Sequence, residues 1–457
     1  MRSAWIKGLV IAGAAAALVG CTLAPGARLA LVCYDDTGAT VSSFNGGFVI
    51  TDIADSDAET AFAVAIAPWV YDVHVDDERP TEGNLAVAGD AGSRSARRFM
   101  VARYRDINGD LEDHYFADGG IVLTDFPGAV SASALAMDIE PGTPYVTSTI
   151  AVAGKAVVDE EHRFAVARYH WYGAMETNFG NDGRVLTSFP GADDAVARAV
   201  ALTPTETGFQ VVAGGDARFP DGRRFAVARY RGDGNLDNSF DDDGRVITDF
   251  AGSTSESIAD LAIVDTDGEK LIVAAGRASG NDGQQIALAR YLWDGSLDTT
   301  FGSGGRIMAA SPGSDGSYAQ AVQVDDRGRI VVAGVARDAE GNSRFMVARF
   351  TTEGVPDLNF GGAGFSTIDF PGAIGALAHG MDIDSEGRIL VAGQAFADGW
   401  KFAVARFLAD GTLDSAFDGD GRVLTDLPTH NEIAFDITFD RRGRINYLVC
   451  AAGQAGD

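Results

Sequence analysis

The chain has 457 residues, of which 46% are hydrophobic and 22% charged, and its formal net charge is −29. This acidic excess argues against nucleic acid and anionic lipid surfaces as partners, because both require a basic footprint. After the N-terminal segment, no stretch is apolar over the length that a membrane-spanning helix needs.

The N-terminal segment has the features of an export signal. Arg2 and Lys7 supply basic charge, residues 8–17 are apolar, and Leu-Val-Gly precedes Cys21. This ending resembles the lipobox of bacterial lipoproteins, in which the cysteine thiol is acylated and becomes the first mature residue. We therefore expect a signal peptide over residues 1–20, lipidation of Cys21 and a short tether over 21–27. Cleavage of an ordinary secretory signal near Ala27 is the alternative.

The residue after Cys21 helps to predict the membrane to which the lipoprotein is sorted. It holds Thr22 where an Asp would stand in lipoproteins kept at the inner membrane. By that resemblance we expect an exported protein, lipid-anchored at the outer membrane or the cell surface, with the periplasmic face as an alternative. The membrane contact would run through the lipid alone.

From residue 28 onward the sequence repeats itself at a spacing of roughly 60 residues. A short apolar motif, typified by Arg-Phe-Ala-Val-Ala-Arg-Tyr at 224–230, recurs seven times and predicts buried strands. The copies begin at Arg28, Arg98, Arg163, Arg224, Gln285, Arg344 and Lys401.

Each copy has three regular companions. A Val-Val-Ala-Gly strand precedes it through a short hairpin, an alternating strand such as 321–325 precedes that, and an Arg-Val-Ile-Thr-Asp-Phe strand follows it, as at 245–250. We therefore expect an all-β fold, a seven-bladed β-propeller of four-stranded antiparallel blades over residues 28–454. The expected order from inner to outer strand is Arg-Val-Leu-Thr-Asp-Phe, alternating strand, Val-Val-Ala-Gly, Phe-Ala-Val-Ala-Arg.

The two ends of the repeat region predict how the ring closes. The chain enters it with a lone Phe-Ala-Val-Ala-Arg-type strand at 29–34, and its last unit, ending with the strand 445–452, lacks one. We expect the N-terminal strand to join the C-terminal blade, since closure removes free sheet edges. A β-solenoid is the main alternative.

The motif itself resembles a known family. Phe225 to Tyr230, then Asp233-Gly234-Asn235-Leu236-Asp237, Phe240 and Gly244-Arg245-Val246 resemble the bacterial delta-60 repeat, a predicted β-propeller family. The resemblance covers nearly the whole mature chain. It implies an exported or surface-associated repeat protein and no established activity.

An arginine and an acid recur together in six of the repeats. The arginine ends the apolar motif and the acid follows about eight residues later; where Cys33 replaces the arginine, Ser42 replaces the acid. We expect structural ion pairs that fold each loop back onto its strand. The pairs are Arg103–Glu112, Arg168–Glu176, Arg229–Asp237, Arg290–Asp298, Arg349–Asp357 and Arg406–Asp414.

The cysteines and the Asp/Gly loops lead to two further predictions. Cys33 and Cys450 fall on strands expected to be neighbours in the closing blade, so we predict a disulfide between them, with two free thiols as the alternative. The Asp/Gly loops, such as 233–237 and 418–421, carry oxygen ligands that suit Ca²⁺, but their spacing is that of tight turns, which we favour. We expect no other metal site or cofactor.

Ligand recognition is expected from loop aromatics. Exposed aromatic rings suit sugar stacking, although packing onto blade edges is the competing reading. The candidates are Trp69, Tyr71 and His74 in the one long insert, together with Trp171 and Trp293. Asp52, Asp125, Asp249, Asp369 and Asp426 recur on the presumed inner strand, where they would line an acidic channel or cap strand ends.

No catalytic constellation is present in the sequence: the six histidines are scattered, and no zinc, phosphate-loop or nucleophile motif occurs. The leading hypothesis is a monomeric, non-enzymatic, lipid-anchored binding scaffold at the cell envelope, with a protein or glycan partner. The alternatives are an envelope polysaccharide lyase or hydrolase, which would need a non-repeating polar cluster at the channel mouth, and a purely structural envelope protein.

Overall fold

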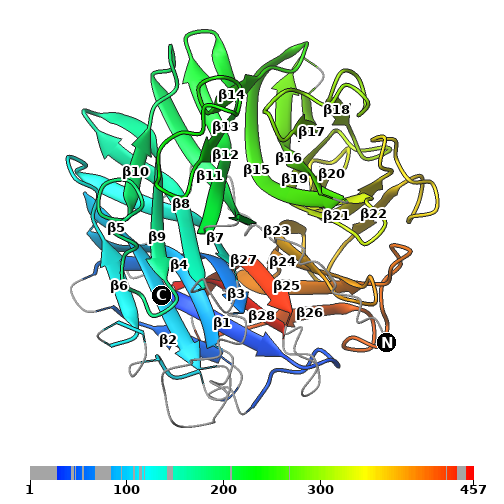
Figure 1. Ribbon diagram of the computed structural model, residues 1–457. Helices are drawn as coiled ribbons and strands as arrows, with labels where there is room; N and C mark the ends of the chain where they lie inside the picture. Colours follow the sequence, from blue (N-terminus) through cyan, green and yellow to red (C-terminus); the bar gives the residue numbers. More distant parts are fainter. Residues whose placement is uncertain are drawn as a thin grey trace, which may run out of the picture.

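The structure is a computed structural model that describes residues 28–42, 46, 48–53, 56–66, 84–93, 95–105, 109–112, 116–117, 119–140, 148–205, 208–266, 268–281, 283–428, 430–439 and 449–456. These residues form an all-β propeller in which sheets radiate from a central axis (Figure 1). They include no helix with the length and apolar character needed to cross a bilayer. The proposed signal peptide and Cys21 lie outside the described residues.

The strands follow one another in groups of four along the chain. The first two complete groups are β3 (Ala58–Ile66), β4 (Asn84–Ser93), β5 (Ala96–Arg105) and β6 (Ile121–Thr124), then β7 (Ser131–Glu140), β8 (Thr149–Val158), β9 (Glu161–His170) and β10 (Arg184–Thr187). The next two are β11 (Asp194–Thr205), β12 (Gly208–Phe219), β13 (Gly222–Tyr230) and β14 (Arg245–Thr248), then β15 (Ser253–Thr266), β16 (Glu269–Gly280), β17 (Gly283–Leu292) and β18 (Arg306–Ala309).

The remaining strands complete the circle. They are β19 (Gly316–Val324), β20 (Ile330–Arg337), β21 (Ser343–Phe350) and β22 (Phe365–Ile368), then β23 (Gly375–Ile383), β24 (Ile389–Phe396), β25 (Trp400–Phe407) and β26 (Arg422–Thr425). The chain ends contribute β1 (Arg28–Tyr34), β2 (Phe48–Thr51), β27 (His430–Phe439) and β28 (Val449–Gly456). The first strands of successive groups contact one another in a closed cycle, from β3 through β7, β11, β15, β19, β23 and β27 back to β3.

The expectation of seven separate four-stranded blades is wrong. The described strands pair into six sheets, five of four strands and one of eight. In the eight-stranded sheet, Arg223 of β13 pairs in parallel with Ser255 of β15, which joins two four-strand groups. The physical reason is the length of β15: its 14 residues extend beyond its own group and run beside the start of β13.

The expected strand order is also wrong. The alternating strand, for example β7, is innermost, and the short Arg-Val-Leu-Thr strand, for example β10, pairs with β9 at the outer edge. Each long Asp/Gly loop therefore connects the third and fourth strands of one group rather than two groups. As a consequence Asp52, Asp125, Asp249, Asp369 and Asp426 follow outer strands, and an acidic channel built from them is excluded.

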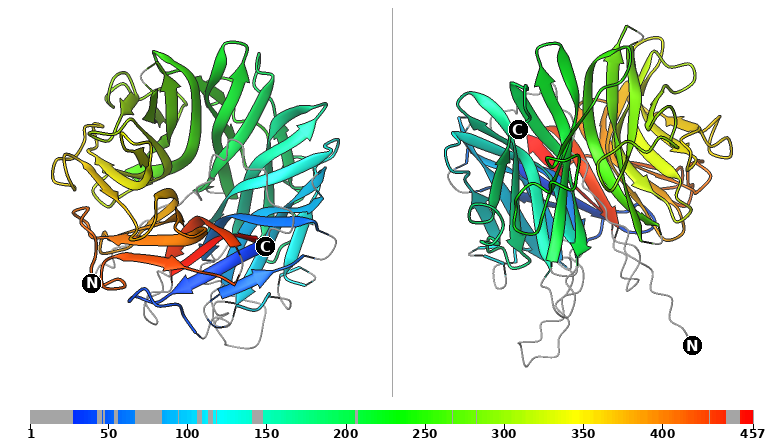
Figure 2. Two further views of the ribbon diagram at one scale, coloured as in Figure 1. Left: turned by 180° about the vertical axis from the view of Figure 1, so that it is seen from behind. Right: turned by 45° about the horizontal axis from the view of Figure 1, so that its top comes forward.

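The chain ends meet in one sheet of order β2-β1-β28-β27. β1 lies antiparallel to β28 with Leu31 opposite Ala452 and Cys33 opposite Cys450. The blue and red strands lie side by side in both views of Figure 2. The prediction that the N-terminal strand pairs with the last strand is confirmed, and the N-terminus contributes two strands rather than one.

The hydrophobic core lies between neighbouring sheets. One cluster joins β19–β22 to β23–β26 and another joins β3–β6 to β7–β10. The recurring phenylalanines form one repeated contact: Phe225 of the apolar motif meets Phe250 after the outer strand edge-to-face, with ring centroids 4.9 Å apart. Phe99–Phe126, Phe164–Phe189 and Phe345–Phe370 repeat it.

Candidate functional site

The glycine of each Val-Ala-Gly motif is required by a bulge on the facing strand. A Cβ added at Gly215 would lie 1.9 Å from the carbonyl oxygen of Val196, and one at Gly154 would lie 2.0 Å from that of Ser133. At this point the first strand carries one extra residue, which is Arg198 on β11, between Ala197 and Ala199. Only glycine lets the two backbones approach so closely.

The bulge gives each first strand one side chain that is outside the pairing register. These residues differ from group to group: Phe62, Leu135, Arg198, Ala259, Gln320, His379 and Phe435. Phe62 and His379 both pack on Phe435, with ring centroids 5.0 and 5.6 Å apart, although the three residues come from β3, β23 and β27. The bulges therefore turn side chains of different groups toward one another at the centre of the molecule.

The residue after each of these glycines also departs from the repeat. It is Asp90, Lys155, Asp216 and Arg277 in four consecutive groups, and Val335 and Gln394 in the next two. Because these positions are equivalent in the repeat, the four charged residues lie at the same level on four successive second strands, β4, β8, β12 and β16. They define what we call the channel-mouth cluster, together with Arg198, Arg223, Asp194 and His162.

Asp216 is the centre of the channel-mouth cluster. Its side chain is 1% exposed. It accepts hydrogen bonds from Arg198 Nε at 2.8 Å, from Ser257 Oγ at 2.8 Å and from an Arg223 terminal nitrogen. Burial alone would raise the pKa of Asp216, but the charges of Arg198 and Arg223 and these hydrogen bonds hold it below its ordinary value. Asp216 is therefore an ionised structural acceptor that orients two guanidinium groups.

A second carboxylate extends the channel-mouth cluster toward solvent. Asp194 Oδ2 lies 3.1 Å from Arg223 Nη2, and its Oδ1 lies 2.6 Å from His162 Nδ1. Burial opposes ionisation, yet the hydrogen bonds and charge of His162, with those of Arg223, hold the pKa of Asp194 well below its usual range. Asp90 behaves differently: it pairs with Arg97 at 2.8 Å, but burial raises its pKa.

The first strands β7, β15, β23 and β27 carry four buried carboxyl groups that the repeat does not predict, namely Asp138, Asp260, Asp382 and Asp436. Three of them accept a hydrogen bond from a backbone N–H of the innermost strand of a neighbouring sheet. Asp138 accepts from Leu202 N at 2.7 Å, Asp260 from Val322 N at 2.8 Å and Asp436 from Val64 N at 2.9 Å. Burial raises the pKa of these three well above its ordinary value.

A separate cleft of about 870 Å³ lies on the outside of the ring, between the β7–β10 and β11–β14 groups. It is lined by outer-strand and loop residues such as Arg184, Thr187 and Asn235, and is more polar than apolar. Its residues belong to the repeat: Arg184, like Arg245 and Arg306, donates to a backbone carbonyl of the preceding group. We therefore regard the channel-mouth cluster as the stronger candidate.

The structure shows direct contacts within the predicted arginine–acid pairs of the repeat. Arg229, Arg290, Arg349 and Arg406 hold their acids through Nε at 2.7–2.9 Å, so these contacts are not bidentate. Arg168 contacts Glu176 through a terminal nitrogen. In the first repeat Glu112 also contacts Arg105 at 3.3 Å, and Arg103 donates to the Trp171 carbonyl at 3.0 Å.

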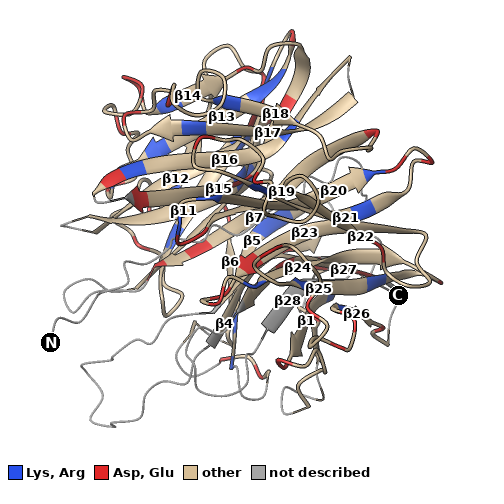
Figure 3. Cartoon of the chain, turned by 90° about the vertical axis from the view of Figure 1, so that its right-hand side faces the viewer, with Lys and Arg blue, Asp and Glu red and all other residues tan. Residues whose placement is uncertain are grey.

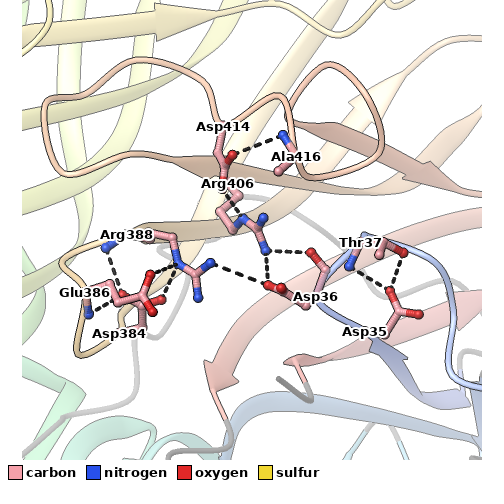
Figure 4. Close-up of polar contacts among 9 residues, drawn as sticks. All are labelled: Asp35, Asp36, Thr37, Asp384, Glu386, Arg388, Arg406, Asp414 and Ala416. Atoms are coloured by element: carbon pink, nitrogen blue, oxygen red, sulfur yellow. Dashed lines mark hydrogen bonds and ion pairs between the residues drawn. The ribbon is translucent and has the colours of Figure 1, made fainter. Parts of the chain in front are cut away.

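These arginines also join neighbouring sheets, which the sequence did not suggest. Arg229 reaches the backbone oxygen of Trp293, Arg290 that of Thr352 and Arg349 that of Ala409. The circle continues across the meeting point of the chain ends: Arg406 Nη1 lies 2.8 Å from Asp36 O and 2.7 Å from its carboxylate, which Arg388 also approaches (Figure 4). The arginines are part of the scaffold.

Of the predicted aromatic ligand surface, the structure describes Trp171 and Trp293. Trp69, Tyr71 and His74 lie outside the described residues. Trp171 has Arg103 over its ring at 4.8 Å, and Trp293 has Arg229 over its ring at 4.5 Å. Trp171 and Trp293 thus occupy equivalent places at two alternate junctions, where scaffold arginines cover one ring face.

The structure also bears on the predictions for the cysteines and for the Asp/Gly turns. Cys33 is disulfide-bonded and stands opposite Cys450 in the strand register; of the three cysteines, the remaining one, Cys21, is outside the described residues. In the Asp/Gly loops the carboxylates cap their own turns, as Asp233 does for Asn235 N at 3.0 Å. No group of three or more metal-ligating side chains occurs among the described residues.

Sequence reasoning missed the channel-mouth cluster, although a signal was available. The residue after the glycine varies between copies of an otherwise similar strand, and it is charged in four successive copies. In Figure 3, acidic residues are frequent in the loops of the molecule. The bulge residues could not be found in this way, because nothing in the sequence marks which residue leaves the register.

Fold and site together describe a β-propeller in which one cluster of charged residues breaks the repeat. Four segments of the chain, residues 210–240, 270–301, 328–360 and 385–417, match the family described as "Domain of unknown function (DUF5122) beta-propeller". Each segment runs from the second strand of a group to its arginine–acid loop. No curated protein matches the chain.

Several solved structures show a distant similarity to this chain. A protein of unknown function from Dyadobacter fermentans is 10% identical over 95% of this chain and 100% of its own, with a TM-score of 0.38. A GH43 endo-arabinanase from Bacillus licheniformis is 14% identical over 61% and 93%, with a TM-score of 0.30. The intramolecular trans-sialidase from Ruminococcus gnavus is 11% identical over 87% and 94%, with a TM-score of 0.33. At these TM-scores the likeness carries no information on function.

Proposed function

We propose that this protein is an exported, lipid-anchored β-propeller that acts as a binding scaffold at the cell envelope, with the channel-mouth cluster as its ligand site. The observation that carries the proposal is the break in the repeat: Lys155, Asp216 and Arg277 differ in charge at a position that is otherwise equivalent. Scaffold residues such as the loop arginines recur around the ring, whereas this set occurs on one side of it. A feature built once on a repeating scaffold favours a ligand.

The chemistry of the channel-mouth cluster favours binding over hydrolysis. Asp216 is fully hydrogen-bonded, and its lowered pKa suits an acceptor rather than a proton donor. Asp194 is likewise held ionised by His162 and Arg223. A glycoside hydrolase needs one carboxyl group that keeps its proton near neutral pH and reaches the substrate.

One observation keeps the enzyme alternative open as a second candidate. Asp90 has a raised pKa while Asp216, two second strands further along, has a lowered one. Carboxyl groups with separated pKa values are the usual acid and base pair of such enzymes. Release of reducing ends or unsaturated products from acidic polysaccharides, lost in Asp90→Asn, would favour this candidate over the scaffold.

The envelope location rests on the sequence of residues 1–27. If Cys21 is acylated, the short tether would hold the propeller close to the membrane, and the resemblance to the delta-60 repeat supports a surface-associated protein. Metabolic labelling with an alkyne fatty acid should mark the wild type and not Cys21→Ser, which should leave the membrane fraction. Equal labelling and equal fractionation of the two proteins would exclude the anchor.

The binding role is tested with the soluble Cys21→Ser protein on a glycan array and on purified envelope polysaccharides. We expect a binder whose signal falls strongly in Asp216→Asn, because the two guanidinium groups lose their orienting partner. Asp326→Asn, at an exposed turn far from the channel mouth, is the matched control. Absence of any glycan or protein binder would instead support the purely structural alternative.

A further inference from the structure

We infer that the outer cleft between the β7–β10 and β11–β14 groups binds an acidic oligosaccharide, a sugar chain that carries carboxylate or sulfate groups. The cleft is a second binding site, separate from the channel-mouth cluster, and its role does not depend on that cluster. Three features of the cleft support this role: its rigid frame, the charge of its lining and its departures from the repeat.

Two hydrogen bonds between the groups fix the walls of the cleft. Gly180 N donates to Asp233 O at 2.8 Å, and Arg245 Nη1 donates to Ser188 O at 2.9 Å. A Cβ added at Gly234 would lie 2.3 Å from Gly180 N, so the loop of the second group lies directly against the first. The fold therefore sets the shape of the cleft, and a volume of about 870 Å³ suits a ligand of about two or three sugar units.

The lining of the cleft is positive, in contrast to the chain as a whole. It contains Arg184, Arg231 and Arg245 and no Asp or Glu, although the chain has 65 acidic residues and a net charge of −29. Asp243 pairs with Arg245 at 2.9 Å, whereas Arg231 is 53% exposed and lies 3.5 Å from Asp233. Arg184 donates to two backbone oxygens and forms no ion pair with a described residue. Such a lining favours an anionic ligand.

The cleft lacks acids that other groups of the repeat carry. The residue after the outer strand is Ser188 here and an aspartate in five other groups, namely Asp52, Asp125, Asp249, Asp369 and Asp426. Asn181, three residues before Arg184, stands where Asp242 stands before Arg245. A carboxylate at either place would repel an anion, so both departures favour the same kind of ligand.

The remaining polar side chains of the cleft suit sugar hydroxyl groups. Asn181 and Ser188 line one wall and Asn238 lines the other. All three are exposed, and none has a side-chain hydrogen bond to another described residue. An amide offers both a donor and an acceptor, as a hydroxyl group does. Guanidinium groups for the acidic groups and amides for the hydroxyl groups together match an acidic sugar better than a free anion.

The test is isothermal titration calorimetry of the full-length, soluble Cys21→Ser protein at one fixed ionic strength. The probes are trimers of D-galacturonate and D-glucuronate with their methyl esters, and a carrageenan tetrasaccharide with its desulfated form. We expect at least one acidic probe to bind about tenfold or more tightly than its neutral form. The uronate and carrageenan arms distinguish a carboxylate from a sulfate ligand.

Two variants place the ligand in the cleft. Ser188→Asp introduces the residue that five other groups carry at this place, so it should unfold at the temperature of the Cys21→Ser parent and bind about tenfold or more weakly. Ala310→Asp adds the same charge after β18, outside the cleft, and should bind like the parent. Arg231→Gln removes a weakly paired, exposed charge and should weaken binding about fivefold or more without changing the unfolding temperature.

The channel-mouth cluster provides the comparison that separates the two sites. Because Asp216 is not in the lining of the cleft, Asp216→Asn should bind the acidic probes like the parent. Binding of no acidic probe, equal binding of the neutral forms, or unchanged binding in Ser188→Asp would each overturn the inference. Binding that is lost in Asp216→Asn and kept in Ser188→Asp would also overturn it, and would leave the proposed scaffold function standing.

Discussion

Arg229 shows how one side chain can organise a junction between two sheets. It is 1% exposed, its Nε lies 2.9 Å from Asp237, and a terminal nitrogen lies 2.8 Å from Ser239 Oγ. The same guanidinium stacks between Phe240 and Trp293, at 4.9 and 4.5 Å from their ring centroids. It therefore folds its own loop and holds the next one through a single buried charge.

At this scale we predict strong energetic coupling between Arg229 and Asp237. Each single alanine variant leaves a buried charge without its partner and should lower the free energy of unfolding by about 3–5 kcal/mol. The double variant should cost clearly less than the sum, as measured by urea unfolding in a double-mutant cycle. Arg231 and Asp233, both 53% exposed and 3.5 Å apart, are the control pair and should couple by less than about 0.5 kcal/mol. Additive effects at the buried pair would refute the coupling.

At the scale of the strands, the central feature is the bulge that faces each Val-Ala-Gly glycine. It explains both the recurrence of the glycine and the freedom of the bulge residue, which can be Phe62 in one group and Arg198 in another. A regular scaffold thus acquires irregular side chains at its centre without a change in strand length.

The bulge predicts which glycines tolerate alanine. In Gly393→Ala the new Cβ would lie 2.0 Å from Leu377 O, so the free energy of unfolding should fall by about 1–3 kcal/mol or more. Gly399→Ala, in the following hairpin of the same sheet, meets nothing within 4 Å and should be neutral or slightly stabilising. Thermal unfolding of the two variants provides the measurement, and similar unfolding temperatures would contradict the close approach.

The buried carboxyl groups of the inner strands predict a pH effect. Burial raises the pKa of Asp260, so the folded chain binds more protons than the unfolded chain between about pH 4 and the raised pKa. This contribution to stability is complete at low pH and is lost as pH rises. Asp260→Asn should therefore gain stability relative to the wild type between pH 6.5 and pH 8.5, in urea titrations at each pH.

The chosen range keeps His379 out of the comparison. Burial lowers the pKa of His379 to about 4, so its effect has the opposite sign: stability is lost as pH falls from about 6.5 toward 4. An unchanged pH dependence in Asp260→Asn would show that Asp260 is ionised in the folded protein.

At the scale of the whole molecule, closure depends on contacts between the two ends of the chain. β1 pairs with β28, and Tyr34 hydrogen-bonds Thr425 at 2.6 Å. The backbone oxygen of Asp36 accepts a hydrogen bond from Arg406. Where every other group has an arginine or acid of the repeat, the closing sheet has Cys33, which is disulfide-bonded. The chain thus replaces an ion pair by a covalent link at the point where it is not continuous.

We predict that this link involves Cys450 and stabilises the ring. Cys33→Ser, or reduction of the wild type, should lower the free energy of unfolding by up to about 5 kcal/mol, because the link closes almost the whole chain. Unfolding with and without reductant measures the effect, and a non-reducing peptide map identifies the partner. Recovery of Cys33 and Cys450 as free thiols in the native protein would refute the prediction.

The sequence predicts the repeat scaffold well and the site poorly. The apolar motif, its hairpin with the Val-Ala-Gly strand and the pairing of the chain ends follow from local pattern, since all three depend on alternation and turn residues. The position of the short outer strand at 245–248 does not follow from local pattern. Its four residues are too few to show whether the strand lies at the inner or the outer edge of its sheet. The channel-mouth cluster depends on contacts between groups, which local pattern does not report.

The shared closing sheet has a consequence for synthesis. β1 and β2 are made before the other strands of the propeller and β28 after them, so the edge of β1 that pairs with β28 waits for its partner through the translation of the strands between them. Pairings so distant in sequence form slowly, and exposed strand edges invite association with other nascent chains. Synthesis of β28, rather than the appearance of any earlier sheet, is then the event that permits the native circle to form.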